Sequence, residues 1–166
     1  MNGMVIRPEA GGDEAGIRAL HREAFGSDAE AGLVDELRDE GVVVLSLVAE
    51  DKGQIVGHVL FSRLMLSEVQ KCASALAPVA VDLRRQKQGI GSRLIEDAHR
   101  RLRTQGETLV FVLGDPAYYT RFGFSAEAAR PFRTPYDGPY LMALAFSPDA
   151  PVSGSVTYPA PFARLG

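Results

Sequence analysis

The sequence predicts an α/β protein in which helices flank a mixed β-sheet. Short apolar runs of strand length alternate with segments of helical periodicity along the chain. Two of these runs are joined by a hairpin-type turn, and another leads through a turn with two glycines into an amphipathic helix. The chain has 166 residues, enough for one domain, and no Pro/Gly/Ser-rich linker divides it before its last 20 residues. We therefore expect a single domain over residues 1–166.

The N-terminal part is predicted to contain one strand and two helices. The apolar run at residues 4–7 is typical of a strand. Asp13 is placed to cap a first helix that ends near Gly26, and Asp28 is placed to cap a second helix that ends at Gly41.

Three strands are expected next. Residues 42–50 and 55–62 are rich in β-branched and apolar side chains, and Asp-Lys-Gly at 51–53 between them favours a hairpin. The third apolar run, residues 72–81, contains Pro78. Proline removes a ladder donor, so this strand must bulge or part from a neighbour.

The second half is predicted to alternate helices and strands. Residues 89–105 form an amphipathic helix, because Ile90, Leu94, Ala98 and Leu102 fall four apart. A buried strand at 108–113, a short helix at 115–121, a strand at 140–146 and a small strand at 156–158 follow.

Bulk properties exclude several classes of protein. The formal net charge is -3, so a basic surplus that would favour nucleic acid is absent. Cys72 is the single cysteine, which rules out an intrachain disulfide and fits a reducing compartment such as the cytoplasm. No apolar run approaches the roughly 18 residues of a membrane helix, and the N-terminus has no signal-peptide pattern.

The segment at residues 79–92 is the most informative for function. It predicts a strand, a turn containing Arg84, Arg85 and Lys87, and a helix that begins near Gly89. The first amides of a helix have no internal acceptors and lie at the positive end of its dipole. Glycines in addition allow a diphosphate to approach the backbone, so the segment predicts an anion site.

Two common phosphate-binding motifs do not fit this turn. A Walker loop requires Gly-Lys-Ser/Thr at the helix entry, where this chain has Gly91-Ser92-Arg93. A Rossmann fingerprint requires a third glycine where Leu94 stands. A glycine turn without a ligand is the remaining structural alternative, although each glycine at a helix start costs about 1 kcal/mol.

Two segments resemble the signatures of the GNAT acetyltransferase superfamily. Gln86-Lys87-Gln88-Gly89-Ile90-Gly91 matches its Gln/Arg-x-x-Gly-x-Gly motif, and Tyr119-Thr120-Arg121-Phe122-Gly123-Phe124 resembles its second motif, an aromatic residue before a Gly-Phe turn. The resemblance covers about residues 4–146 and leaves 147–166 as a C-terminal extension. It implies a GNAT-like mixed sheet splayed between its fourth and fifth strands.

The resemblance also implies a cofactor, acetyl-CoA, and no metal. Its pantetheine arm would pair with the backbone of the fourth strand, and its diphosphate would lie on the glycine turn. The implied cofactor-binding residues are Val79, Ala80, Val81, Gln86, Lys87, Gln88, Gly89, Ile90, Gly91, Ser92 and Asp115. A backbone amide near Ala80 is the candidate oxyanion donor. Asp115 could equally cap the short helix.

Tyr119 aligns with the general acid of the family. A phenol keeps its proton at neutral pH and can donate to a departing thiolate. Tyr119 could instead only pack beside Phe122 and Phe124, and Tyr118 is the neighbouring alternative.

The general base is not identified by the sequence. Relatives often carry a glutamate on the fourth strand, which residues 72–81 lack. Glu23, Glu68, His58 and groups that act through a water relay remain candidates, although a histidine in an apolar strand is more often a core residue. Cys72 has no histidine partner that the sequence places beside it, so a nucleophilic role is not expected.

The sequence therefore predicts an N-acetyltransferase whose acceptor, a primary amine of a small molecule or peptide, attacks acetyl-CoA directly. The alternative is a non-catalytic acyl-CoA-binding or regulatory module with the same fold. The resemblance implies that residues 25–30 and the loop at 131–137 choose the acceptor, and the aromatic residues of this loop could line a pocket or close the core. The sequence leaves the oligomeric state open, a homodimer included.

Overall fold

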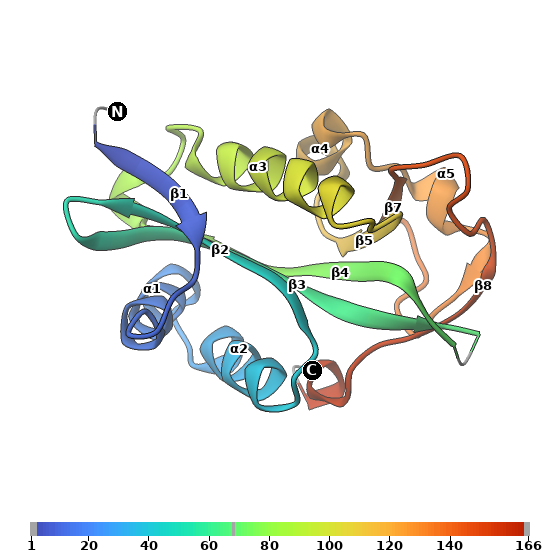
Figure 1. Cartoon of the computed structure of the whole chain (residues 1–166), viewed down its shortest axis with the longest axis horizontal. Coiled ribbons are helices and arrows are strands. Elements are labelled where there is room, and N and C mark those ends of the chain that lie inside the picture. The colour runs from blue at the N-terminus through green and yellow to red at the C-terminus, as the bar shows by residue number, and fades with distance from the viewer. Residues whose placement is uncertain (1–2, 68, 165–166) are drawn as a thin grey trace.

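The computed structural model describes residues 3–67 and 69–164, and of residues 69–72 only the backbone. Its mixed sheet has the strand order β1-β2-β3-β4-β5-β7 (Figure 1). The bounds are β1 Met4–Pro8, β2 Val43–Asp51, β3 Gln54–Leu66, β4 Val69–Val81, β5 Leu109–Leu113 and β7 Leu141–Ala145. Neighbours along this path are antiparallel except β4 and β5, which are parallel. The predicted mixed sheet is thus confirmed.

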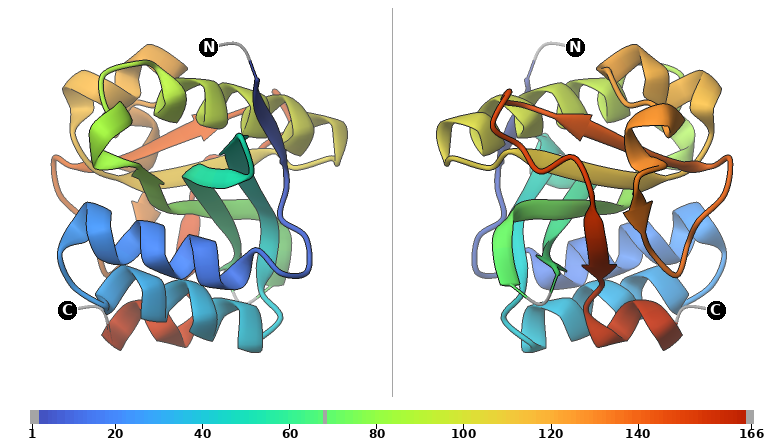
Figure 2. Two further views of the ribbon diagram at one scale, coloured as in Figure 1. Left: turned by 90° about the vertical axis from the view of Figure 1, so that its left-hand side faces the viewer. Right: turned by 90° about the vertical axis from the view of Figure 1, so that its right-hand side faces the viewer.

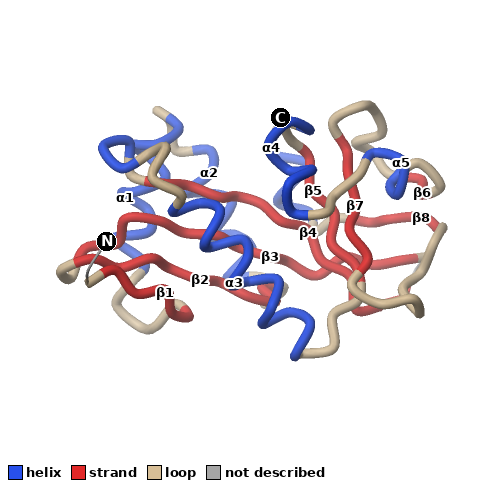
Figure 3. The backbone as a smooth tube through the Cα atoms, turned by 90° about the horizontal axis from the view of Figure 1, so that it is seen from above, coloured by secondary structure: helices blue, strands red, loops and turns tan. Residues whose placement is uncertain are grey.

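Helices cover both faces of the sheet, as Figures 1 and 2 show. Helices α1 (Glu14–Phe25) and α2 (Ala29–Asp39) lie on one face, and α3 (Ile90–Thr104) crosses the other (Figure 3). Each face has its own apolar cluster: Leu37 and Leu60 belong to the one beneath α1 and α2, and Leu94 and Phe61 to the one beneath α3. The long strands are consequently buried on both sides, which explains their nearly continuous apolar sequence.

Local signals explain most of the boundaries. The predicted hairpin joins β2 to β3 through Lys52 and Gly53, both with positive φ. Asp13 occupies the N-cap position of α1 as expected, but the prediction that its side chain caps the helix is wrong. Its carboxylate accepts from the amide of Ala10 and from the Arg7 guanidinium instead. Asp28 likewise makes no capping bond and pairs with Arg22.

The chain after β5 contains several short elements. Their bounds are α4 Pro116–Tyr119, the 3-10 turn η2 Thr120–Phe122, α5 Ala126–Ala129, β6 Phe132–Arg133, β8 Gly154–Thr157 and the 3-10 helix η3 Ala160–Arg164. The short helix and the small late strand were expected, whereas α5, β6 and η3 were not.

The C-terminal extension packs onto the body of the protein, beside β3 and α2 (Figure 2). Strand β8 pairs with the end of β3 through Met65↔Thr157 and Leu66↔Val156. Phe162 of η3 is buried in the cluster beneath α1 and α2. Among the described residues, no helix has both the length and the apolar character needed to cross a bilayer.

Candidate active site

Strands β4 and β5 part in the middle of the sheet. Their parallel pairing runs from Ala73↔Leu109 to Leu76↔Val112 and ends there, while β4 continues to Val81. The Ala77–Pro78 peptide, which is cis, begins this unpaired stretch. The splay predicted between the fourth and fifth strands is therefore confirmed, and it lies beside the proline that the sequence singled out.

Beyond the splay, β4 is paired with a neighbouring strand on one side only, that of β3. The amide of Asp82 donates to the carbonyl of Val56 on β3, at 2.9 Å. Main-chain groups two residues apart on a strand point the same way, so the amide of Ala80 faces β3 as well. The amides of Val79 and Val81 consequently face the open edge toward β5. An oxyanion donor from this strand would be one of these two amides rather than that of Ala80.

The glycine turn leads into α3 through two residues with left-handed backbone. Lys87 and Gly89 both have positive φ, of 67° and 84°. The first internal bond of the helix runs from the amide of Arg93 to the carbonyl of Gly89, which leaves the amides of Ile90, Gly91 and Ser92 for an external acceptor. A Cβ atom at Gly91 would lie 3.1 Å from the Tyr118 hydroxyl. The start of α3 therefore presents three main-chain amides without an acceptor inside the helix.

A cleft of about 650 Å³ joins the splayed strand to this turn. Most of the predicted cofactor-binding residues line it, namely Val79, Ala80, Val81, Gln86, Lys87, Gly89, Ile90, Gly91 and Ser92. Gln88 and Asp115 are not among its lining residues. The Asp115 carboxylate accepts from the amide of Ala117 and caps α4, as the capping alternative expected.

Two of the basic residues of the turn form ion pairs. Arg84 pairs with Asp82, and Arg85 pairs with Asp51 on β2. These two guanidiniums therefore also hold the turn against its surroundings. Arg85, Lys87 and Arg121 line the cleft, the last with its guanidinium 4.8 Å from the ring centre of Tyr118. Sequence reasoning missed Arg121, although it lies inside the second motif.

The two adjacent tyrosines of α4 occupy different places. Tyr118 lines the cleft, and its hydroxyl lies 3.4 Å from the Ser92 hydroxyl at the start of α3. Tyr119 lies against the end of β5, where a Cβ atom on Gly114 would come within 2.5 Å of its ring. Burial, and to a lesser degree Tyr118, raises the pKa of Tyr119 to about 12. Tyr118 thus lies near the start of α3, and Tyr119 near the splay.

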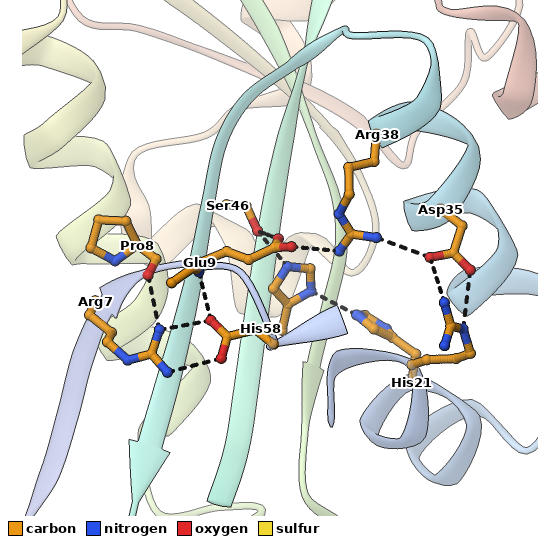
Figure 4. A network of polar contacts seen from close by, with 11 residues as sticks. Arg7, Pro8, Glu9, His21, Asp35, Arg38, Ser46 and His58 are labelled. Carbon is orange, nitrogen blue, oxygen red and sulfur yellow. Dashed lines mark hydrogen bonds and ion pairs between the residues drawn. The ribbon is translucent and has the colours of Figure 1, made fainter. Parts of the chain in front are cut away.

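None of the base candidates that the structure describes lines the cleft. Glu23 is exposed and borders a separate hollow between α1 and the β2–β3 turn. Glu68 lies outside the described residues, and so does the side chain of Cys72. His58 is fully buried in a polar network, drawn in Figure 4. The interpretation of His58 as a core histidine is the one that the structure supports.

This network fixes the protons on two rings. Ser46 donates to Glu9, at 2.6 Å, so its oxygen accepts from Nε2 of His58. Nδ1 of His58 is then an acceptor, and it receives the proton of Nε2 of His21 at 2.8 Å. Arg38 pairs with Glu9 at the far end. Burial lowers the pKa of His58 well below its usual value and that of His21 to about 4, so both rings are neutral.

The described part of the chain brings together no group of three or more histidine, cysteine, aspartate or glutamate side chains that could hold a metal ion. The polar groups of the cleft are main-chain amides, basic side chains, hydroxyls and the carboxamide of Gln86, and none of these is acidic, which suits an anionic ligand.

Comparison with known proteins agrees with this geometry. A family model described as an acetyltransferase (GNAT) domain matches residues 5–126. The uncharacterised N-acetyltransferase YhbS of Escherichia coli K12 is 41% identical over 136 residues, or 81% of each chain. YjhQ of the same organism, also called an uncharacterised N-acetyltransferase, is 38% identical over 132 residues, which cover 76% of this chain and 73% of YjhQ.

Two solved structures are similar over nearly the whole chain. The Escherichia coli YhbS structure in complex with CoA has a TM-score of 0.92 and 37% identity, and the match covers 99% of this chain and 94% of that one. A GNAT family acetyltransferase from Brucella melitensis in complex with acetyl-CoA has a TM-score of 0.84 and 38% identity, and the match covers 98% of this chain and 99% of that one. Together with the splayed sheet and the glycine turn, these matches establish that the chain belongs to the GNAT acetyltransferase family.

Proposed function

We propose that this protein is an N-acetyltransferase that moves the acetyl group of acetyl-CoA directly to a primary amine. The observation that carries the proposal is the cleft itself, because it joins an open strand edge to an anion-binding helix start. Two relatives of known structure, at 37% and 38% identity, hold CoA and acetyl-CoA respectively. We also propose that it acts in the cytoplasm, since a chain with one cysteine needs no oxidising compartment.

The residues of the cleft would hold the donor as follows. The amides of Ile90, Gly91 and Ser92 would bind the diphosphate, with Lys87 and Arg121 supplying positive charge. Gln86 lies beside the strand edge, where its amide nitrogen is 3.5 Å from the carbonyl oxygen of Val81. The open edge of β4 would pair with the amide groups of the pantetheine arm and so direct the thioester toward the splay.

The transfer needs an oxyanion donor and two proton movements. The amine nitrogen forms a bond to the thioester carbon, the carbon–sulfur bond breaks, and the proton lost by nitrogen balances the one gained by sulfur. The amide of Val79 or Val81 would stabilise the oxyanion. Tyr119, whose raised pKa keeps it protonated, would donate to the departing sulfur. Because no carboxylate lines the cleft within the described residues, we expect the amine to lose its proton to water.

The test is a calorimetric titration with acetyl-CoA, followed by an acceptor screen that detects free thiol. The screen should include polyamines, aminoglycosides and peptides with free N-termini. We expect saturable acetyl-CoA binding and amine-dependent thiol release. Absence of binding at millimolar acetyl-CoA would refute the proposal. Binding without thiol release for any amine class would favour the non-catalytic acyl-CoA-binding module.

Paired tyrosine variants test the assignment of roles. Tyr119→Phe is expected to lower kcat at least tenfold with little change in acetyl-CoA affinity, because it removes only the proton donor. Tyr118→Phe is expected to change acetyl-CoA affinity more than kcat, because its hydroxyl lies beside the α3 N-terminus. Full turnover in Tyr119→Phe would show that the general acid is a different group.

A further inference from the structure

A second cavity lies across the sheet from the cleft. It has a volume of about 360 Å³ and borders the point where β4 and β5 part. Ala75 and Ala77 of β4 and Phe111 and Leu113 of β5 form its strand side. Most of these residues belong to the apolar cluster beneath α1 and α2, whereas the cleft borders the cluster beneath α3. We call it the distal cavity.

The other side of the distal cavity is aromatic and comes from late in the chain. It is lined by Tyr136 of the loop at residues 131–137, which we call the late loop, and by Tyr158 and Phe162 of the C-terminal extension. The ring centres of Tyr136 and Tyr158 are 4.8 Å apart, and those of Tyr158 and Phe162 are 5.4 Å apart, edge to face in both pairs. These contacts fix the rings against one another while the small side chains Ala75 and Ala77 leave space opposite.

The lining suits an uncharged, apolar occupant. None of the described residues that line the distal cavity is charged. An aliphatic amine carries a positive charge at neutral pH, and in this cavity it would lose its hydration without a carboxylate partner. A hydrocarbon chain has no such cost and would gain from burial.

The splay gives such a chain a route from the thioester. The same strand lines both spaces, with Ala77 in the distal cavity and Val79 in the cleft, on either side of Pro78. The pairing of β4 with β5 has already ended at Leu76↔Val112, so no strand–strand hydrogen bonds close the gap at this level. A chain attached to a thioester at the splay is therefore directed toward the distal cavity.

We propose that the distal cavity receives the acyl chain of the donor, and that the protein uses acyl-CoA thioesters with chains longer than acetyl. The inference rests on the proposed function, because the thioester must first bind in the cleft. The chemistry is unchanged: the carbon–sulfur bond of the longer thioester breaks, a carbon–nitrogen bond forms, and the proton from the amine balances the one taken up by sulfur.

The test compares the affinities of acetyl-CoA, butanoyl-CoA and hexanoyl-CoA by calorimetry, at concentrations at which none forms micelles. Each buried methylene should tighten binding by about fourfold. Butanoyl-CoA, with two more methylenes than acetyl-CoA, should thus bind at least fourfold more tightly even if one methylene stays exposed. Equal affinities for the three thioesters would overturn this inference and leave the proposed function standing. No binding of any of them would overturn both.

Cavity variants show where the chain lies. Ala75→Leu fills the distal cavity from inside, and Leu113→Trp narrows it at a residue that is 56% exposed, so the second variant should fold even where the first does not. Both variants should bind acetyl-CoA as tightly as the unmodified protein does. Their affinity should, however, no longer increase with the length of the acyl chain. Val152→Trp, at an exposed position that does not line the distal cavity, is the matched control and should keep the gain. If affinity increased with chain length in the cavity variants as much as in the unmodified protein, the inference would be overturned.

Discussion

Lowering the pH from 7 to 5 should destabilise this fold through its buried histidines. His21 is 0% exposed and His99 is 5% exposed. Burial lowers the pKa of each ring from 6.5 to about 4, with smaller contributions from Arg38 and Arg103 respectively. Because each pKa is lower in the folded state, the unfolded chain takes up protons first as the pH falls. The stabilisation is complete above pH 6.5 and is lost as the pH falls toward 4.

The size of the effect follows from these values. A histidine with a pKa of about 6.5 unfolded and about 4 folded loses roughly 2 kcal/mol between pH 7 and pH 5. His21 and His99 together therefore lower the free energy of unfolding by about 3 to 4 kcal/mol, a large share of a typical 5–15 kcal/mol. His58 acts in the same direction, since a proton on its Nδ1 would oppose the one donated by His21. Asp13, with a pKa below 3.8, stays ionised in this range.

The assay is urea unfolding followed by circular dichroism at pH 7, 6 and 5. His99→Phe is the informative variant, because His99 is surrounded by the rings of Phe61, Phe124 and Phe146, and its Nε2 has no hydrogen-bond partner among the described residues. This variant should fold at pH 7 and show about half of the pH dependence attributed to the pair. A free energy of unfolding that stays constant from pH 7 to pH 5, or a His99→Phe variant with an unchanged slope, would refute the reasoning.

Three further predictions concern packing and charge. Gly57→Ala should destabilise the protein by about 1 to 3 kcal/mol and weaken acetyl-CoA binding, because a Cβ atom there would lie 2.9 Å from side-chain atoms of both Ile90 and Leu94 and would displace the start of α3. Unchanged affinity in calorimetry would contradict this. Arg63→Met should cost about 3 kcal/mol in urea unfolding, because it takes away the bidentate partner of the buried Glu107 carboxylate. Replacing Glu107 by Leu in the same chain should restore part of the loss, and no recovery would argue against an isolated buried charge as the cause. Raising the salt concentration should weaken acetyl-CoA binding, since its phosphates would bind to basic groups and helix amides in the proposed site. An affinity that does not depend on salt would count against that site.

The sequence was sufficient for the main elements of the fold and for the glycine turn before α3, because both depend on local signals. The hairpin at Lys52-Gly53, the amphipathic period of α3 and the glycine turn before it are each encoded within a few residues. Pro78 in an apolar run predicted the parting of β4 from a neighbour, because a missing donor is a property of the residue itself.

Features that depend on distant residues were not predictable in the same way. The Asp13 carboxylate could cap α1 or meet Arg7, and only the pairing of β1 with β2 decides which groups lie within its reach. Asp115 offered two roles of equal merit, and the structure uses it as a cap. The aromatic residues of the late loop were expected either to close the core or to line a pocket, and they do both. Phe132 closes the core against Phe111, and Tyr136 lines the distal cavity.

The sequence by itself determined the order of the main strands and helices, the family and the strand–turn–helix unit that borders the cleft. Only the tertiary structure decided which tyrosine lies at the splay, which amides of β4 face the open edge, and that the C-terminal extension closes an apolar cavity beside them. The physical reason is the distance along the chain over which each kind of interaction acts. Propensity, periodicity and turn chemistry act over neighbouring residues, whereas a cavity is the space left between side chains that come from β4, β5, the late loop and η3.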